Sequence, residues 1–208
     1  MAINIDLSNY TITKDDAFIV DANVWIYLFS PFSNNDYGYN TFLSNAISKK
    51  CKLFVNSQII SEYINVICRA AYEKYLQENH LDRRYFKFKR NYQQTTDFKN
   101  YYQLACESVK NDILQYSKIL PIKLWHIRKS LNNYHQMNDF NDLVYTQMLT
   151  TRLKIISHDN DFRNHPEDII SPLVKSSATS SLITRVPEVK LFGLAQTKYL
   201  RFYTFEFV

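Results

Sequence analysis

The sequence predicts an α/β fold with a mostly parallel central sheet. Four short apolar runs are candidate strands, at residues 18–20, 52–57, 117–122 and 154–157, and longer segments with helical patterns separate them. Strands that alternate with helices along a chain favour a parallel sheet. Apolar residues make up 46% of the 208 residues, which is enough for one sizeable buried core.

Each element follows from its local pattern. A helix can begin at Ala22, directly after the first strand, and further helices are expected over residues 39–51, 57–77, 101–116, 123–137 and 138–153. The helix over 57–77 has the clearest apolar stripe, and Ser57 is its expected N-cap. Residues 158–174 read as a loop with an edge strand.

The expected organisation is one domain. Residues 1–171 would form it, with a polar, basic and aromatic insertion at about 80–120. Residues 172–208 alternate polar and apolar side chains and would form a C-terminal extension of the same domain. No internal repeat or low-complexity segment is present.

The composition and the lack of certain motifs argue against several classes of protein. The two glycines, Gly38 and Gly193, are too few and too far apart for a dinucleotide fingerprint or a phosphate-binding loop. The three cysteines form no CxxC pair, which favours reduced thiols. The N-terminal sequence resembles no signal peptide, and no apolar run approaches the ~18 residues of a membrane span. We therefore expect a cytoplasmic protein without a membrane partner. A net charge of +5 gives a weak bias toward polyanions.

Acidic residues recur where strands end and helices begin. Six fall at such positions: Asp21, Glu62, Asp139, Asp142, Asp159 and Asp161. Ligands of parallel sheets bind outside the carboxyl ends of the strands. Carboxylates gathered there remain ionised together only with a cation among them, and oxygen ligands suit Mg²⁺ or Mn²⁺.

Four segments around these acids resemble, in order, the acidic motifs of PIN-domain nucleases, a family that includes VapC-type toxins. They are "FIVDANVWIY", "VNSQIISEYINVICR", "NDLVYTQMLTTRL" and "KIISHDNDF", and they span about residues 18–162. The resemblance implies a three-layer α/β/α sandwich. It also implies Mg²⁺- or Mn²⁺-dependent cleavage of RNA, usually single-stranded, to a 5′-phosphate and a 3′-hydroxyl.

The resemblance assigns catalysis to Asp21, Glu62, Asp142 and Asp159. Of these acids, Asp21, Asp142 and Asp159 would bind the metal, with Asp161 as an accessory ligand.

Asn23 and Ser157 match polar positions that support the acids, and Asp139 is grouped with them. In "DLVYTQ", bulky residues replace the small ones that the family has after its third acid. The segment at 80–120 is also longer than in compact toxins.

Basic residues are candidates for RNA contact. Arg69 shares a helix face with Glu62. The run "RRYFKFKR", with Arg83, Arg84 and Lys87, mixes charge with rings that could stack on bases. The alternative is a solvated insertion whose aromatic side chains pack inward, and Arg69 could be a plain surface arginine.

Simpler interpretations stay open for each acid. Asp21 could bond only to the next backbone amides, and Glu62 could face solvent. Asp139 and Asp142 could cap a helix, and Asp159 and Asp161 could form an Asx turn.

Among functions, the alternatives are a non-catalytic PIN-like scaffold for RNA or protein and a haloacid-dehalogenase-type phosphatase. The phosphatase needs a second aspartate where this chain has Asn23. Expected partners are RNA, an antitoxin protein and a second copy of the chain.

Overall fold

The computed structural model describes residues 4–7, 10–150, 152–159, 162 and 169–171. Six strands of this part form one sheet in the order β1-β6-β5-β2-β3-β4, and every neighbouring pair is parallel. Their bounds are Asn4–Asp6 (β1), Ala17–Val20 (β2), Lys52–Val55 (β3), Ser117–Ile119 (β4), Leu153–Ile156 (β5) and Ile169–Ser171 (β6). The prediction of an α/β fold with a mostly parallel sheet is confirmed.

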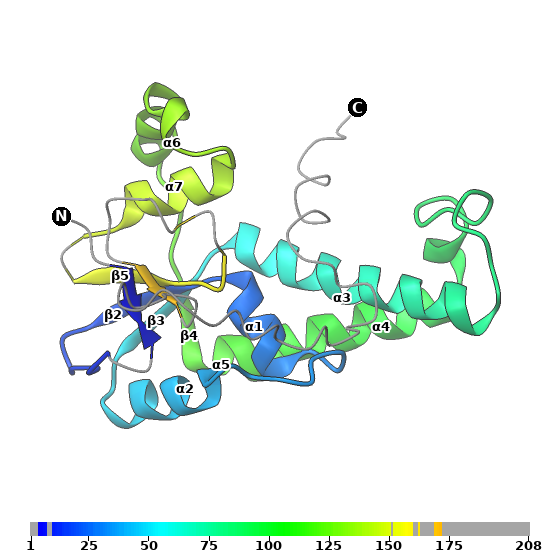
Figure 1. Ribbon diagram of the computed structural model, residues 1–208, viewed down its shortest axis with the longest axis horizontal. Coiled ribbons are helices and arrows are strands. Elements are labelled where there is room, and N and C mark those ends of the chain that lie inside the picture. Colours follow the sequence, from blue (N-terminus) through cyan, green and yellow to red (C-terminus); the bar gives the residue numbers. More distant parts are fainter. Residues whose placement is uncertain (1–3, 8–9, 151, 160–161, 163–168, 172–208) are drawn as a thin grey trace, which may run out of the picture.

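Helices connect the strands and cover both faces of the sheet (Figure 1). The helices are α1 (Ala22–Phe29), α2 (Tyr39–Ser48), α3 (Ser57–Glu78), α4 (Thr96–Ser108), α5 (Leu114–Tyr116), α6 (Leu124–Asn132) and α7 (Phe140–Met148). α6 and α7 lie on one side of the sheet, whereas α2 and α5 lie on the other. This arrangement is consistent with three layers, α/β/α. α3 and α4 pack against each other and extend beyond the sheet.

The central strand β2 is buried on both faces, as expected for a parallel strand covered by helices. Phe18, Ile19 and Val20 are at most 1% exposed. Burial of a large apolar side chain contributes about 1.5–3 kcal/mol, so packing compensates for the short ladder of hydrogen bonds. The indole N–H of Trp25 donates a 3.0 Å bond to the Val20 carbonyl, which ties α1 to the end of β2.

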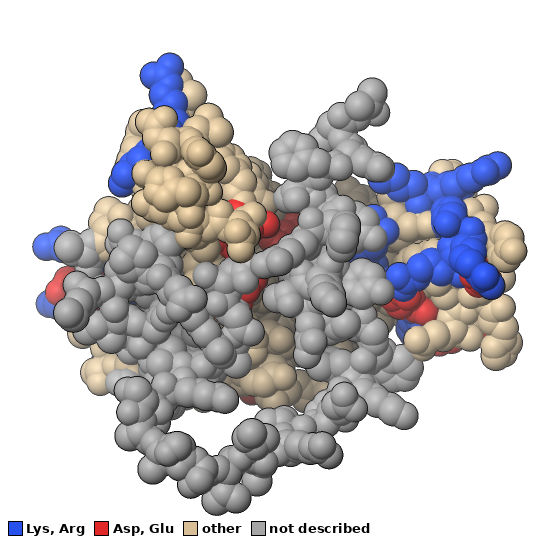
Figure 2. Space-filling view, turned by 45° about the horizontal axis from the view of Figure 1, so that its top comes forward, with Lys and Arg blue, Asp and Glu red and all other residues tan. Residues whose placement is uncertain are grey.

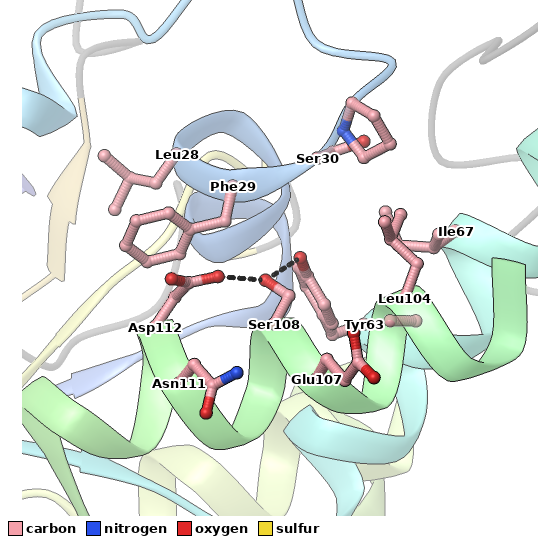
Figure 3. A pocket seen from close by; sticks show the side chains of 12 residues that line it. Leu28, Phe29, Ser30, Tyr63, Ile67, Leu104, Glu107, Ser108, Asn111 and Asp112 are labelled. Carbon is pink, nitrogen blue, oxygen red and sulfur yellow. Dashed lines mark hydrogen bonds between the residues drawn. The ribbon is translucent and has the colours of Figure 1, made fainter.

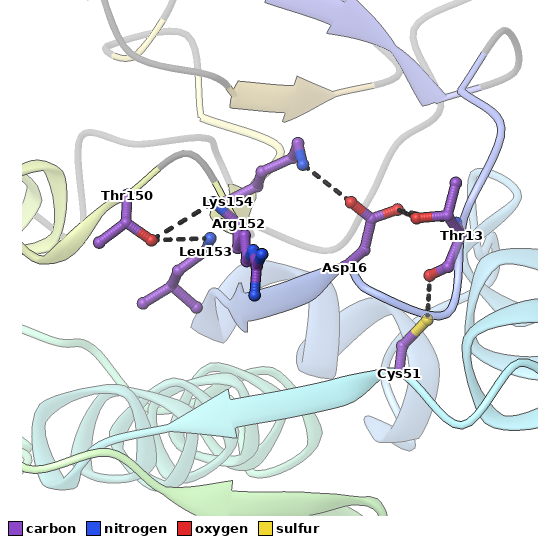
Figure 4. A network of polar contacts seen from close by, with 7 residues as sticks. All are labelled: Thr13, Asp16, Cys51, Thr150, Arg152, Leu153 and Lys154. Atoms are coloured by element: carbon purple, nitrogen blue, oxygen red, sulfur yellow. Dashed lines mark hydrogen bonds and ion pairs between the residues drawn. The ribbon is translucent and has the colours of Figure 1, made fainter.

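A polar network fixes the amino ends of the central strands (Figure 4). Lys154 at the start of β5 donates a 2.8 Å charged bond to Asp16, which directly precedes β2. The backbone N–H and the hydroxyl of Thr13 donate to the other Asp16 oxygen at 2.8 and 3.0 Å. The thiol of Cys51, just before β3, donates to the Thr13 carbonyl. These bonds align the starting points of β2, β3 and β5, and therefore also their carboxyl ends.

Several local predictions were wrong. Asn56, not Ser57, caps α3, because the Asn56 Oδ1 accepts the Ile59 N–H at 2.9 Å. The last predicted helix ends at Met148 and not at residue 153, since Leu149 has an extended backbone. β1 has no counterpart among the predicted strands. It pairs with β6, so β6 lies inside the sheet and not at its edge.

The expected insertion is a helical hairpin. The helix predicted over 101–116 begins at Thr96 as α4 and continues through the π-helical turn η3 (Val109–Ile113) into α5. The expected extension over 172–208 lies outside the described residues. Across the described ranges, no helix is both long enough and apolar enough to cross a membrane.

Candidate functional site

Three polar residues stand directly beyond the carboxyl ends of three adjacent strands. Asp21 follows β2, Asn56 follows β3 and Ser157 follows β5. The register pairs Val20 with Ile156 and Ile19 with Phe54, so the three polar residues lie level with one another. This edge of an open parallel sheet is where ligands bind in such folds.

Asp21 is buried and bonded through both carboxylate oxygens. Its exposed fraction is 5%, and Oδ1 accepts the Ala22 N–H at 2.7 Å, which caps α1. Oδ2 accepts the Ser157 hydroxyl at 2.6 Å and the Asn23 amide at 2.8 Å. The simple helix-cap interpretation is therefore correct in part, but it does not account for the two side-chain donors that hold Oδ2.

Asn23 and Ser157 bind the loop after β5 to Asp21. The Asn23 Nδ2 also donates to the Ser157 hydroxyl at 3.1 Å, and its Oδ1 accepts the His158 N–H at 2.9 Å. The fully buried Ser157 hydroxyl accepts the Asp159 N–H at 3.0 Å. The amide nitrogen and the amide oxygen of Asn23 thus both hold neighbouring groups in place. A phosphatase of the haloacid-dehalogenase type would need a second aspartate at this position, where the chain has Asn23.

Two helices bring further acids to the site. Asp139 caps α7, since its Oδ1 accepts the N–H groups of Asn141 at 2.8 Å and Asp142 at 3.3 Å. The predicted capping role of Asp139 is confirmed. Asp142 lies in the first turn of α7, and Glu62 lies in the second turn of α3; both are partly exposed.

The charges of five acids interact across these elements: Asp21, Glu62, Asp139, Asp142 and Asp159. Burial, followed by the charges of Asp21, Asp139 and Asp159, raises the pKa of Glu62 to about 8. The same two causes raise the pKa of Asp142 well above its ordinary value. Burial and the charge of Asp159 raise the pKa of Asp21 to about 6, although the bonds from Ser157 and Ala22 oppose this rise. At this edge of the sheet, burial and mutual repulsion therefore both disfavour the ionised forms of Asp21, Glu62 and Asp142.

The five acids do not form a closed ligand set. No three His, Cys, Asp or Glu side chains are arranged to hold a metal ion in the part of the chain that the structure describes. Asp161, the predicted accessory ligand, lies outside the described residues. The structure thus brings the four predicted catalytic acids within electrostatic range of one another, but the described side chains are not arranged to hold a metal ion.

Tyr145 interacts electrostatically with these acids, although no sequence motif indicated it. Its side chain is 1% exposed, and its hydroxyl has no hydrogen-bond partner among the described residues. Burial and the charges of Asp21, Glu62, Asp142 and Asp139 raise its pKa. A buried hydroxyl without a partner costs about 1–3 kcal/mol, so such groups usually have a partner in the functional state. The spacing of three residues from Asp142 was the only local signal.

Asn56 is a second polar residue that the motifs did not indicate. The residue is 2% exposed, and its Oδ1 is used by the cap of α3. Its Nδ2 has no partner within the described ranges. At this edge of the sheet the structure therefore holds an unpartnered donor next to the end of β2.

The basic candidates lie away from the five acids. The Arg69 guanidinium stacks over the Phe88 ring, 3.7 Å from its centroid. Arg83, Arg84 and Lys87 are exposed on the turn between α3 and α4. Arg83 pairs with Glu73, and Arg84 pairs with Asp82. In this structure, these four basic residues therefore do not contact the place where a ligand would bind among the acids.

A separate open groove lies where the end of α1 meets α3 and α4 (Figure 3). Its volume is about 490 Å³. The Tyr63 hydroxyl is 2.9 Å from the Ser108 hydroxyl, which donates to Asp112 at 2.7 Å. The groove is lined by none of the five acids, so the candidate site is the edge of the sheet and not this groove.

Comparison with known proteins gives no family for the chain: no family model matches it, and no curated protein matches it.

Proposed function

We propose that this chain is a metal-dependent endoribonuclease of the PIN-domain type, which hydrolyses phosphodiester bonds of single-stranded RNA. Its proposed role is that of the toxin in a toxin–antitoxin pair in the cytoplasm, with an antitoxin and a second copy of the chain as protein partners. The observation that carries the proposal is the convergence of five interacting carboxylates at the carboxyl ends of parallel strands. The four motifs that resemble the family surround those same acids.

The residues present suit a divalent cation in their chemistry. All the donors are carboxylate oxygens, which Mg²⁺ and Mn²⁺ prefer. Burial and then mutual repulsion raise the pKa of Glu62 and Asp142, and a cation would relieve the repulsion. The unpartnered hydroxyl of Tyr145 is a further polar group that a bound ion, water or phosphate would satisfy. Asp21, Asp142, Asp159 and Asp161 would hold the metal.

The chain's own groups have distinct roles in this proposal. A bound metal would supply Lewis-acid polarisation of the phosphate and a water of lowered pKa. Ser157 and Asn23 hold the Asp21 carboxylate in one orientation. The Ser157 hydroxyl accepts the N–H of Asp159 and donates to Asp21, so it connects the loop after β5 to the Asp21 carboxylate. The partly exposed Glu62 would reach the metal through water or assist a second ion.

One observation favours a second candidate, a PIN-like scaffold that binds RNA without cutting it. The described acids form no closed ligand set, as would be expected if no metal were needed. The retained acids and their raised pKa values favour the nuclease.

The deciding experiment uses the full chain and a labelled single-stranded RNA. Cleavage would be compared in Mn²⁺, in Mg²⁺ and in EDTA, for the wild type and for Asp21→Asn, which keeps the shape and removes the charge. Asp36→Asn is the matched control, because Asp36 also accepts backbone N–H groups at a helix start but lies outside the five acids. Mn²⁺ binding by calorimetry gives a readout that does not depend on the choice of RNA.

Metal-dependent cleavage that Asp21→Asn abolishes and Asp36→Asn retains would support the proposal. If the protein binds RNA but neither cleaves it nor binds Mn²⁺, the scaffold would be favoured. A folded wild type with neither RNA binding nor Mn²⁺ binding would overturn both candidates.

A further inference from the structure

The turn between α3 and α4, residues 79–95, lies at the far end of the helical hairpin and is called the hairpin cap below. α3 begins beside the sheet, where it carries Glu62, and continues to Glu78. At 1.5 Å per residue, the distance along the helix from Glu62 to its end is about 24 Å. The hairpin cap is therefore remote from the five acids but rigidly connected to them.

The aromatic side chains of the hairpin cap pack inward. Phe88 is 9% exposed and Tyr92 is fully buried, and both pack against Tyr72 and Leu76 of α3 in a second, small core. Ring centroids of Tyr72 and Phe88 are 5.5 Å apart in an edge-on arrangement. The rings that the sequence offered for stacking on bases are thus largely used internally. Among the aromatic rings of the hairpin cap, Tyr85 is an exception at 80% exposure.

The charged side chains of the hairpin cap point outward. Residues 79–95 contain five Lys or Arg and one Asp, an excess of four positive charges in a chain whose net charge is +5. Arg83 and Arg84 have acidic partners. Lys87, Lys89 and Arg90 are exposed and make no ion pair within the described ranges. Figure 2 shows Lys and Arg side chains gathered at this end, with acidic side chains visible on the same face nearer the centre.

We propose that the hairpin cap is a second RNA-binding site, which holds backbone phosphates remote from the bond that is cut. This inference rests on the proposed function and specifies its substrate: an RNA long enough to span both sites. At about 3.4 Å per nucleotide of a helical strand, 24 Å corresponds to about seven nucleotides, and to fewer in an extended strand. Because most of its aromatic rings are buried, the hairpin cap would bind the phosphates of the RNA and would not distinguish its bases.

Electrostatics gives the reason for two sites. A polyanion is repelled by the five acids until a cation neutralises them, so their edge of the sheet cannot supply long-range attraction for RNA. The exposed charges of Lys87, Lys89 and Arg90 supply this attraction at the hairpin cap. The connection through α3 and α4 then holds the RNA in a fixed relation to the acids.

The test measures RNA binding by fluorescence anisotropy in EDTA, where the proposed nuclease cannot cut. The test variant is Lys87→Gln/Lys89→Gln/Arg90→Gln. The matched control, Lys14→Gln/Lys49→Gln/Lys52→Gln, removes three exposed charges at the amino ends of the strands. Probes of about 6 and about 20 nucleotides bracket the span, and a polyglutamate peptide of equal charge tests for an acidic protein partner.

For the longer RNA, we expect the test variant to bind about 10- to 100-fold more weakly than wild type. The slope of log K against log salt should decrease by about 2, since each lost contact with a single strand contributes about 0.7. The control should remain within about threefold of wild type, and both variants should keep the wild-type melting temperature because the changed side chains are exposed.

Equal losses in the test variant and the control would overturn the inference, as would polyglutamate binding as tight as RNA binding. Metal-dependent cleavage that the test variant retains in full on the longer RNA would also overturn it, while the proposed function would stand. If the protein never cuts RNA but binds it through the hairpin cap, the RNA-binding role of the hairpin cap would be supported. The proposed nuclease function would then be overturned instead.

Discussion

The Ser157 hydroxyl donates a 2.6 Å hydrogen bond to the Asp21 carboxylate, although 136 residues separate the two in the chain. The bond is buried, and it connects the residues that follow β5 and β2. Ser157 also accepts the Asp159 N–H, so one hydroxyl joins two of the acids proposed to bind metal. This relationship makes Ser157 the residue whose loss most directly tests how the site is organised.

Ser157→Ala is expected to cost about 1–3 kcal/mol in the free energy of unfolding, because it removes a buried hydrogen bond to the Asp21 carboxylate and the acceptor of the Asp159 N–H. Loss of this supporting bond should also weaken Mn²⁺ binding about 10- to 100-fold by calorimetry. Ser130→Ala is the control, since Ser130 is equally buried but donates only to the His126 carbonyl. Equal Mn²⁺ affinity in the two variants would show that Ser157 has a purely structural role.

Tyr145→Phe should separate ligand binding from stability. In EDTA the variant should be at least as stable as wild type, because it removes a buried hydroxyl without a described partner. The rise in melting temperature on adding Mn²⁺ should be smaller than in wild type if the hydroxyl contacts a bound group.

Tyr63→Phe is the control for Tyr145→Phe, and its expected results are the reverse. Its hydroxyl has a partner in Ser108, so this variant should lose stability in EDTA and keep the full Mn²⁺ response. A full Mn²⁺ response in Tyr145→Phe would remove Tyr145 from the site.

Without divalent metal, stability should fall as pH rises through the acidic and neutral range. The folded-state pKa values of Glu62 and Asp21 are raised to about 8 and about 6, above the ordinary values of 4.5 and 3.8. The folded protein therefore binds protons more tightly than the unfolded chain, and this stabilisation, present at low pH, is lost as pH rises toward about 8. Differential scanning calorimetry in EDTA at several pH values checks this expectation.

Mn²⁺ should reverse the loss, with a larger gain in melting temperature near pH 8 than near pH 5.5, since metal and protons compete for the same carboxylates. At about 100 times its dissociation constant, the metal would contribute about 2.7 kcal/mol. Glu62→Gln should flatten the pH dependence in EDTA. An unchanged profile in that variant would place the cause elsewhere.

Asp16→Asn should destabilise the protein by about 2–3 kcal/mol at neutral pH, because it leaves Lys154 with little solvent and no charged partner. Burial alone would raise the pKa of Asp16, but the bonds from Lys154 and Thr13 lower it to about 2 from 3.8. The contribution of Asp16 is thus fully present above about pH 4 and is lost as pH falls toward about 2.

Urea unfolding of wild type and Asp16→Asn at neutral and acid pH checks this prediction, because the difference between the two proteins should shrink below about pH 4. A penalty that is the same at both pH values would contradict it. RNA cleavage should be unaffected, since Asp16 lies at the opposite ends of the strands from Asp21.

The elements that could be predicted are those that a local pattern of apolar residues specifies. An uninterrupted apolar run indicated β2, and helical spacing of apolar residues indicated α3 to within a residue of its bounds. β1 could not be predicted in this way, because Asn4–Asp6 has a single apolar side chain and becomes a strand only by pairing with β6. Non-local pairing overrides local preference in short strands.

For the candidate site, the sequence by itself determined which acids stand at the ends of strands and the starts of helices, since each such position depends on a few neighbouring residues. Long-range packing sets the bond between Ser157 and Asp21, and it leaves the Tyr145 hydroxyl near the acids without a partner among the described residues. The same packing turns Phe88 and Tyr92 inward, while Lys87 and Lys89 beside them are exposed and make no ion pair with any described residue. The physical reason is that burial and hydrogen-bond partners are set by residues far apart in the chain, which no local pattern records.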